Sequence, residues 1–213
     1  MSNEVLQTLL DRARAAQAAY AVFDQAQVDA IVRAMAKVVY DNAEELAKIA
    51  VEETRMGVYA DKVAKNKGKS KVIWNDLKDK KSIGILRVLE EEGIVEVAKP
   101  MGVIGAVAPT TNPTVTAMSN AMFALKGGNA IIIAPHPRAK NVSRITVEMM
   151  NAAIKPLGAP DHLIQIIDEP SIELTNQLMQ AVDVVIATGG GAMVKAAYSS
   201  GKPAYGVGPG NVQ

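Results

Sequence analysis

The amino-acid sequence predicts an α/β protein in which helices and one β-hairpin precede a five-stranded parallel sheet. Two observations support this prediction. From Met101 onward, five short apolar runs alternate with helix-like segments, which is the pattern of a parallel sheet covered by helices on both faces. Before Met101, apolar residues recur at three- and four-residue steps, which indicates amphipathic helices. We therefore expect one domain over residues 1–100 and a second over residues 101–213.

Four helices are predicted in the first domain, and the first two each carry an apolar stripe at helical spacing. The stripe of the first helix consists of Val5, Leu9, Ala13, Ala16 and Tyr20. The stripe of the second consists of Val28, Ile31, Val32, Met35, Val38 and Val39. Asp24 and Gln27 have the spacing of a capping box, so the second helix is expected to begin at Asp24.

The third helix is predicted to begin with another capping pair, Asp41 and Glu44, and to end near Gly57. A lysine-rich helix then covers residues 59–80. Its lysines could meet phosphate groups, but such a run is usually a solvated helix face, and we prefer that interpretation. The segments SIGILRVL and GIVEVAK follow, and they flank the stretch EEEG. This pattern predicts a β-hairpin over residues 82–99 with its turn at residues 91–93.

The five strands of the sheet are predicted in the runs GVIGAVA, NAIIIAP, LIQII, DVVIAT and AYGV. The helices between them are expected near residues 113–126, 138–157, 171–181 and 192–199. Ligands of such sheets bind beyond the carboxyl ends of the strands. Those ends read APTTNP, APHPR, DEPS, ATGGG and GVGPG, and all are rich in residues that suit a binding rim.

The segment ATGGGAM is the clearest local candidate for a binding site. A buried strand ends at Thr188, three glycines follow, and a helix begins directly after them. Glycines let a phosphate approach the backbone, and the N–H groups at a helix start attract an anion. A tight turn that requires glycine would explain the same residues, and the spacing alone does not separate the two interpretations.

Three other strand ends carry polar candidates. Asn112 precedes Pro113 at a helix start, where Asn112 or Thr111 could simply cap the helix, and the spacing alone favours this interpretation. Alternatively, Asn112 could direct its amide into the cleft as an oxyanion donor. His136 lies between two prolines without an evident partner, which favours a structural role over acid–base chemistry. Asp168 and Glu169 could form a catalytic pair, but a helix entry with Ser171 as the N-cap is the better explanation.

Composition excludes several classes of function. The 213 residues contain no cysteine, which excludes disulfides, thiolate metal sites and a cysteine nucleophile within them. Two histidines are too few for a histidine-based metal site, so no metal is expected. The net charge of +1 gives no general attraction to nucleic acid or to an anionic membrane. The N-terminus lacks the apolar core of a signal peptide, and we expect a cytoplasmic protein.

Taken together, the motifs resemble the CoA-acylating aldehyde dehydrogenases. This family includes acylating succinate-semialdehyde and acetaldehyde dehydrogenases and the aldehyde dehydrogenase half of bifunctional aldehyde-alcohol dehydrogenases. The matching segments are KNKGKSKVIWNDLKDKKSIGIL, PTTNPT, NAIIIAPHPRAK, DEPSIELTNQLM and ATGGGAMVKAAYSSGKPAYGVGPGN. They occur in the family's order and spacing, and they cover essentially the whole chain.

The resemblance implies an aldehyde-dehydrogenase-like fold with a Rossmann-like cofactor sheet and a hairpin arm used in oligomers. Asn112 matches the family's oxyanion-hole asparagine. The implied cofactor-binding residues are Pro109, Thr110, Thr111, Pro135, His136, Thr188, Gly189, Gly190, Gly191, Gly206, Val207 and Gly208. The cofactor would be NAD or NADP, because no acidic residue near IAPHP indicates NAD. The implied partners are coenzyme A, a small aldehyde or acyl-CoA, and further copies of the chain, and neither nucleic acid nor a membrane is expected.

The reaction that the resemblance implies converts an aldehyde, CoA and NAD(P) into acyl-CoA and NAD(P)H through a cysteine thioester. The family's cysteine follows the point where this sequence ends, so we expect the chain to be the front portion of such an enzyme and inactive alone. Hydrolytic relatives carry a water-activating glutamate where this chain has Gly206, which favours release of the acyl group to CoA. The alternative is a non-catalytic nucleotide-binding or interaction module.

Overall fold

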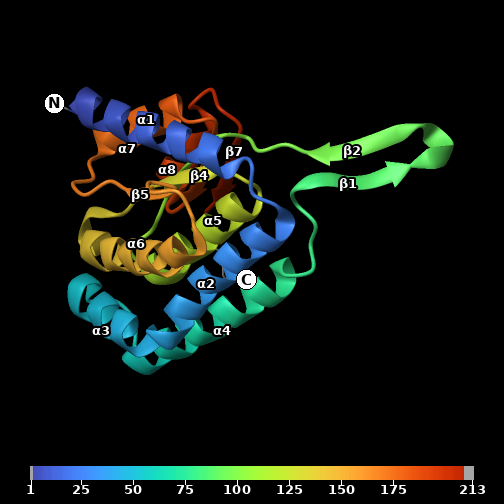
Figure 1. Cartoon of the computed structure of the whole chain (residues 1–213). Helices are drawn as coiled ribbons and strands as arrows, with labels where there is room; N and C mark the ends of the chain where they lie inside the picture. Colours follow the sequence, from blue (N-terminus) through green and yellow to red (C-terminus); the bar gives the residue numbers. More distant parts are fainter. Residues whose placement is uncertain (1, 209–213) are drawn as a thin grey trace, which may run out of the picture.

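The structure is a computed structural model that describes residues 2–208 (Figure 1). Its α-helices are α1 (Ser2–Tyr20), α2 (Gln25–Asp41), α3 (Ala43–Thr54), α4 (Tyr59–Leu77), α5 (Pro113–Lys126), α6 (Lys140–Ile154), α7 (Ile172–Ala181) and α8 (Gly191–Tyr198). Its strands are β1 (Gly84–Leu89), β2 (Ile94–Ala98), β3 (Val103–Val107), β4 (Ala130–Ala134), β5 (Ile164–Ile166), β6 (Val184–Thr188) and β7 (Ala204–Val207). The predicted order of helices, hairpin and five parallel strands is confirmed.

The five-stranded sheet has the order β5-β4-β3-β6-β7, and all its strands are parallel. The chain starts in the centre at β3, runs outward through β4 to β5, and then crosses back to β6 and β7. This reversal between β3 and β6 is the switch point at which sheets of this class bind ligands. Every residue of β3 and β4 is buried, which explains why both strands read as continuous apolar runs.

Helices cover the sheet in unequal layers. On one face, α5 and α6 pack on the strands, and α2, α3 and α4 form a second layer over these two helices (Figure 1). On the other face lie α1, α7 and α8, with α1 crossing the β4 side. One continuous apolar core runs from Leu6 to Ala197. The boundary that we predicted near residue 100 stays a prediction, because the N-terminal helices share this core with the sheet.

The N-terminal helices confirm one capping prediction, and they correct a second capping prediction and part of one apolar stripe. Asp24 and Gln27 form the predicted capping box of α2. In contrast, α2 continues through Asp41, whose carboxylate pairs with Lys37, so the predicted pair Asp41 and Glu44 does not start α3. Asn42 holds that position and makes no side-chain cap. The stripe of α1 was also partly wrong, because Val5 is exposed, and Leu6 and Leu10 are buried instead.

The hairpin formed by β1 and β2 stands away from the rest of the molecule as an arm (Figure 1). Its 3₁₀ turn at Glu90–Glu92 and the left-handed Gly93 confirm the predicted turn. Arg87 and Glu96 pair across the strands, and this contact raises the pKa of the guanidinium and lowers that of the carboxyl. Six apolar side chains of the arm are exposed, namely Ile85, Leu86, Val88, Ile94, Val95 and Val97.

A polar network fixes the root of the arm to the helical layers. The Gln25 side-chain oxygen accepts the main-chain N–H groups of Ser82 and Ile83, at 2.8 and 3.0 Å. The Ser82 hydroxyl donates to the main-chain oxygen of Lys126, and the buried Lys126 ammonium pairs with Asp29 of α2. The root of the arm is therefore fixed to the helical layers, whereas β1 and β2 contact mainly each other.

The helix α1 is tied to the sheet by contacts from far along the chain. Arg14 pairs with Asp183 at the start of β6, and the Gln165 amide donates to the main-chain oxygen of Leu9. These two contacts hold α1 against the sheet, at the start of β6 and at β5. Among the residues that the structure describes, no helix has the length and apolar character needed to cross a membrane.

Candidate functional site

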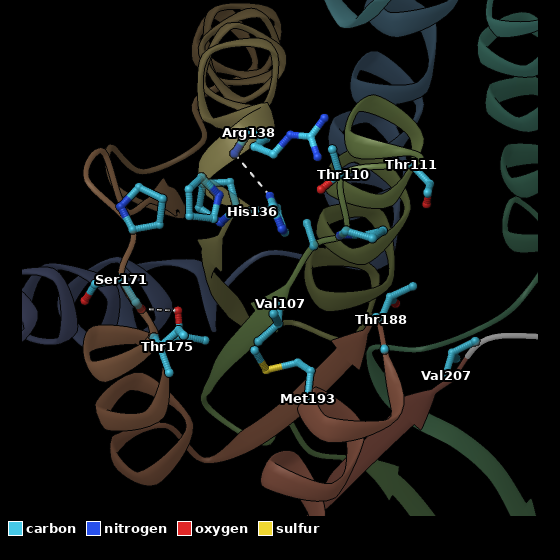
Figure 2. A pocket seen from close by; sticks show the side chains of 18 of the residues that line it. Val107, Thr110, Thr111, His136, Arg138, Ser171, Thr175, Thr188, Met193 and Val207 are labelled. Atoms are coloured by element: carbon cyan, nitrogen blue, oxygen red, sulfur yellow. Dashed lines mark hydrogen bonds between the residues drawn. The ribbon is translucent and has the colours of Figure 1, made fainter. Parts of the chain in front are cut away.

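A cavity of about 800 Å³ opens at the carboxyl edge of the sheet, where the switch point lies (Figure 2). It gathers ten of the predicted site residues, namely Pro109, Thr110, Thr111, Pro135, His136, Thr188, Gly189, Gly190, Val207 and Gly208. These come from the ends of β3, β4, β6 and β7. Three predicted site residues, Asn112, Gly191 and Gly206, are not part of its lining.

The lower part of the cavity is apolar. Met193 of α8 extends toward Val107 at the end of β3, and Ile172 of α7 belongs to the same lining (Figure 2). Ser171 and Thr175 lie on one side of the cavity, while Thr188 and Val207 lie on the opposite side. The Thr175 hydroxyl donates to the Ser171 main-chain oxygen at 2.8 Å, so it is already engaged. The cavity thus combines an apolar slot between α7 and α8 with polar groups around it.

The helices that begin at this edge differ in what satisfies their first N–H groups. The Glu53 carboxylate accepts the N–H groups of Asn141 and Val142 at the start of α6, at 2.8 and 2.7 Å. Ser171 caps α7, as predicted. By contrast, no side chain among the described residues caps α8, which follows Gly190 directly. A Cβ at Gly190 would meet nothing within 4 Å, so this helix start is both uncapped and open.

His136 and Arg138 form the wall of the cavity beyond β4. The Nδ1 atom of His136 accepts the main-chain N–H of Arg138 at 3.1 Å, which places the proton of the neutral ring on Nε2 (Figure 2). The Arg138 guanidinium donates to the main-chain oxygen of Thr54 at 3.2 Å. The structural role that we favoured for His136 is therefore present, and its second ring nitrogen is left as a donor.

Asn112 occupies the N-cap position of α5, but its side chain makes no capping hydrogen bond. The peptide before Asn112 is held by α4, because the Lys62 ammonium on that helix donates to the Thr111 main-chain oxygen at 3.1 Å. Burial, with a smaller contribution from Lys65, lowers the pKa of Lys62. Lys62 departs from the rest of the predicted solvated face, because it is partly buried and contacts the main chain beyond β3, and no sequence pattern distinguishes it from its neighbours.

Gly206 faces α8 rather than the cavity. A Cβ there would lie 2.6 Å from Cγ1 of Val194 and 3.0 Å from Cε2 of Tyr198, and the Gly206 N–H donates to the Tyr198 hydroxyl. Position 206 therefore suits glycine because α8 packs too closely on β7 for a Cβ to fit. It also leaves no room for a glutamate side chain at this position without movement of α8.

The other polar candidates lie outside the cavity lining. Glu169 pairs with Lys140, and neither Asp168 nor Glu169 belongs to the lining, so the two do not form a catalytic pair there. Within residues 2–208, no group of three or more His, Asp or Glu side chains could hold a metal ion. An apolar slot, an open helix start and a donor-bearing wall suit an elongated ligand with an aromatic end and anionic groups.

The sequence and the structure are similar to known proteins over almost the whole chain. Residues 1–204 match the profile described as "Aldehyde dehydrogenase family". A "Succinate-semialdehyde dehydrogenase (acetylating)" from Clostridium kluyveri is 60% identical over 100% of this chain and 47% of its own length. These matches agree with the resemblance predicted from the motifs.

Two solved structures are similar in fold as well. An acetylating aldehyde dehydrogenase from Geobacillus thermoglucosidasius has a TM-score of 0.96 at 43% identity, over 99% of this chain and 47% of that one. A propionaldehyde dehydrogenase from Rhodopseudomonas palustris with bound propionyl-CoA has a TM-score of 0.83 at 36% identity, over 97% and 46%. The chain thus spans somewhat less than half the length of these relatives.

Proposed function

Because the chain belongs to the aldehyde dehydrogenase family, we propose that it forms the cofactor-binding part of an NAD(P)-dependent CoA-acylating aldehyde dehydrogenase. The overall reaction would convert an aldehyde, CoA and NAD(P) into acyl-CoA and NAD(P)H. The names of its relatives support the acylating assignment. The single observation that supports the cofactor role most is the cavity at the switch point of the sheet, with the uncapped start of α8 on its edge.

The described residues fit a dinucleotide in three places. The slot between α7 and α8, with Ile172 and Met193, suits the flat face of an adenine. The N–H groups that follow Gly190 suit a pyrophosphate, because they have no capping side chain and no Cβ blocks their approach. Thr188 and Val207 lie at the far side, where they would border the nicotinamide. When bound, the nicotinamide supplies hydride transfer.

Charge at position 190 tests the cofactor role directly. Gly190→Asp adds a carboxylate at an N-cap, where aspartate is favourable, so the fold should be retained or slightly stabilised. The same carboxylate repels a pyrophosphate, and we expect the affinity for NADH and NADPH to fall at least about tenfold, which is about 1.4 kcal/mol. Gly190→Asn is the matched neutral control and should lose much less. Affinities can be measured by the fluorescence of the reduced nicotinamide. Equal affinities for the Asp and Asn variants would contradict this site.

Asn112 remains a proposed oxyanion donor. Its amide is not spent on capping α5, which leaves it available for a substrate oxygen. A capping role predicts that Asn112→Ala destabilises the chain by about 0.5–2 kcal/mol, whereas the oxyanion role predicts little change in stability. Urea unfolding of the two proteins separates these outcomes. In an enzyme that supplies the nucleophile, the oxyanion role predicts a rate loss of about a hundredfold or more.

One observation favours the second candidate, a non-catalytic nucleotide-binding module. The 213 residues contain no cysteine, so they do not themselves supply the thiolate that the acylating reaction requires. Reading the gene beyond the codon for Gln213 decides between the two. A cysteine-bearing segment in frame there supports the enzyme, and an immediate stop codon supports the module. A cytoplasmic location stays a prediction from the sequence.

We also propose that the arm pairs with another copy of the chain. An isolated two-stranded hairpin is marginal in water, and the arm exposes apolar side chains on both strands. Replacing Val88 and Val95 with aspartate should reduce the sedimentation coefficient in analytical ultracentrifugation and leave the helical content unchanged. An unchanged coefficient would show that the arm is not the contact.

A further inference from the structure

We propose that Lys62 of α4 is a positioning residue for the reaction, and that it acts by holding the peptide between Thr111 and Asn112. Through this peptide, Lys62 sets the direction in which the Asn112 side chain points. The inference rests on the proposed function, in which the Asn112 amide donates to a substrate oxygen. It assigns a task to a residue that lies outside the parallel sheet.

The loop that carries Asn112 has few contacts of its own. It is anchored at Ala108, whose N–H donates to the main chain of β4, and at Asn112, whose main-chain oxygen accepts an N–H of α5. Between these anchors, the main chain of residues 109–111 receives one hydrogen bond from the described residues, and its donor is Lys62. The orientation of the peptide before Asn112 therefore depends on a single side chain from another layer.

The Lys62 side chain follows a defined path to this loop. It leaves the first turn of α4 and passes Gly57, where an added Cβ would lie 3.0 Å from Cε of Lys62. The φ of Gly57 is +81°, a conformation that favours glycine, so the turn before α4 leaves room for the lysine. The buried Ser70 hydroxyl also donates to the Met118 sulfur at 3.2 Å and ties α4 to α5. Helix α4 thus presents the ammonium at a fixed place beside the start of α5.

The charge of Lys62 is poorly compensated, which argues against a role in stability alone. Burial and, to a smaller extent, the like charge of Lys65 lower the pKa of Lys62. Among the described residues, no carboxylate forms an ion pair with it, and the Thr111 oxygen is the acceptor of its hydrogen bond. A partly buried cation without a counter-ion costs desolvation energy that this one bond offsets incompletely. The contact is better explained by what it does for the loop.

Holding the Thr111 oxygen determines the direction of the next side chain. A peptide group is planar, so a fixed carbonyl oxygen fixes the rotation of the whole plane. That plane in turn sets the φ of Asn112, which is −145°, and with it the direction of the Asn112 Cβ. The Asn112 amide makes no cap to α5, so no local bond would restore its direction after a rotation. A displacement of about 1 Å at a catalytic group can cost about a hundredfold in rate.

The first measurement uses this chain and determines NMR order parameters for the main-chain N–H groups of Thr111 and Asn112. We expect about 0.85 in the wild-type chain, as for a rigid backbone, and less than about 0.6 in Lys62→Met. Lys62→Arg keeps a charged donor and should retain most of the order. Lys65→Met is the matched control, because it removes the same charge from an exposed position of α4 and should leave both values unchanged. Thermal melting establishes that each variant is folded.

The second measurement is the rate of acyl-CoA formation in an enzyme that joins this chain to a cysteine-bearing segment. We expect Lys62→Met to lower kcat about tenfold, a smaller loss than that of Asn112→Ala, with the KM for the aldehyde nearly unchanged. Lys62→Arg should recover most of the rate. Because Lys62 acts through Asn112, adding Lys62→Met to Asn112→Ala should cause no further loss. A role in folding alone would not produce this dependence.

The outcomes separate the two levels of the proposal. If the enzyme forms no acyl-CoA, the proposed function fails, and the order parameters still decide whether Lys62 holds the peptide. Unchanged order parameters in Lys62→Met overturn the inference. An equal loss of order in Lys65→Met also overturns it, because general charge would then explain the effect. A further loss of rate when Lys62→Met is added to Asn112→Ala overturns the positioning role, because Lys62 would then act independently of the amide.

Discussion

The two ends of the sheet differ in how completely they are covered. On the β4 side, each residue of β3 and β4 is buried between α1 on one face and α5 and α6 on the other. On the β7 side, Tyr205 and Val207 are 69% and 60% exposed, and Ala197 is the buried residue of α8. The cavity spans both ends, so one of its walls follows fully buried strands and the other rests on few buried residues.

This difference suggests separate tasks for the two walls. A fully packed strand holds the residues that follow it in place, which suits the recognition of a fixed group of a ligand. A lightly covered strand and helix can adjust, and their exposed apolar side chains suit contact with a further part of the protein or another chain. The four substitutions below, from the largest expected effect to the smallest, test whether the stabilities of the two ends differ as described.

Ile132→Ala at the centre of β4 should have the largest effect. The side chain of Ile132 is fully buried, so its truncation leaves a cavity in the best-packed part of the sheet. We expect the free energy of unfolding to fall by about 4 kcal/mol. Urea denaturation measures this change, with Val207→Ala on β7 as the matched control, for which we expect less than about 0.5 kcal/mol. Similar losses at both positions would contradict the comparison.

Asp29→Leu should cost about 3 kcal/mol, because it leaves the ammonium of Lys126 buried without its partner. Lys126 ends α5, so this pair joins α5 to α2 in the helical layers that cover the sheet, and the main-chain oxygen of Lys126 also binds Ser82 at the root of the arm. The double variant Asp29→Leu with Lys126→Met removes both charges and should recover most of the loss. Equal instability of the single and double variants in thermal melting would show that the charge is not the cause.

Gly206→Ala tests a tight contact between β7 and α8, on the β7 side of the sheet. Its Cβ would lie 2.6 Å from Val194, which requires α8 to move relative to β7, and we expect a loss of about 2 kcal/mol. Gly208→Ala is the control, because a Cβ there meets nothing within 4 Å, and it should change stability very little. If α8 moves easily, the two variants will have the same free energy of unfolding, which would sharpen the view that this side is adjustable.

Tyr205→Ser should have the smallest effect on stability, below about 0.5 kcal/mol, because the Tyr205 side chain is mostly exposed. If the β7 side is a contact surface, the same change should weaken self-association, which sedimentation equilibrium would detect as a higher dissociation constant. Ser199→Ala, at an exposed position beside Tyr198, provides a control that removes little apolar area. Unchanged association of the Tyr205 variant would argue against a contact at this edge.

The fold was predictable because its signals are local. The buried strands read as short apolar runs, and the rim residues follow these strands directly, so ten of the predicted site residues meet in one cavity. Gly206 does not line this cavity because the position of a Cβ there points toward α8, which the run AYGV does not reveal.

The contacts that the sequence did not reveal join segments far apart in the chain. Lys62 reaches Thr111, Arg138 reaches Thr54, and Glu53 reaches the start of α6. No periodicity or spacing encodes such pairs, because the tertiary packing of the helical layers brings them together. The predicted start of α3 was wrong for a different, local reason, since Asp41 pairs with Lys37 one turn earlier and continues α2 instead of capping the next helix.

The two ties of α1 to the sheet have a consequence for synthesis on the ribosome. Gln165 and Asp183, which bond to Leu9 and Arg14, lie 156 and 169 positions later in the chain. At a synthesis rate of about 5–20 residues per second, α1 emerges roughly 10–30 seconds before these partners exist. During that interval the apolar stripe of α1 has no sheet to cover. Nascent chains arrested before and after residue 183 should therefore differ in the protease sensitivity of α1, and a chaperone that binds amphipathic helices would find its substrate there.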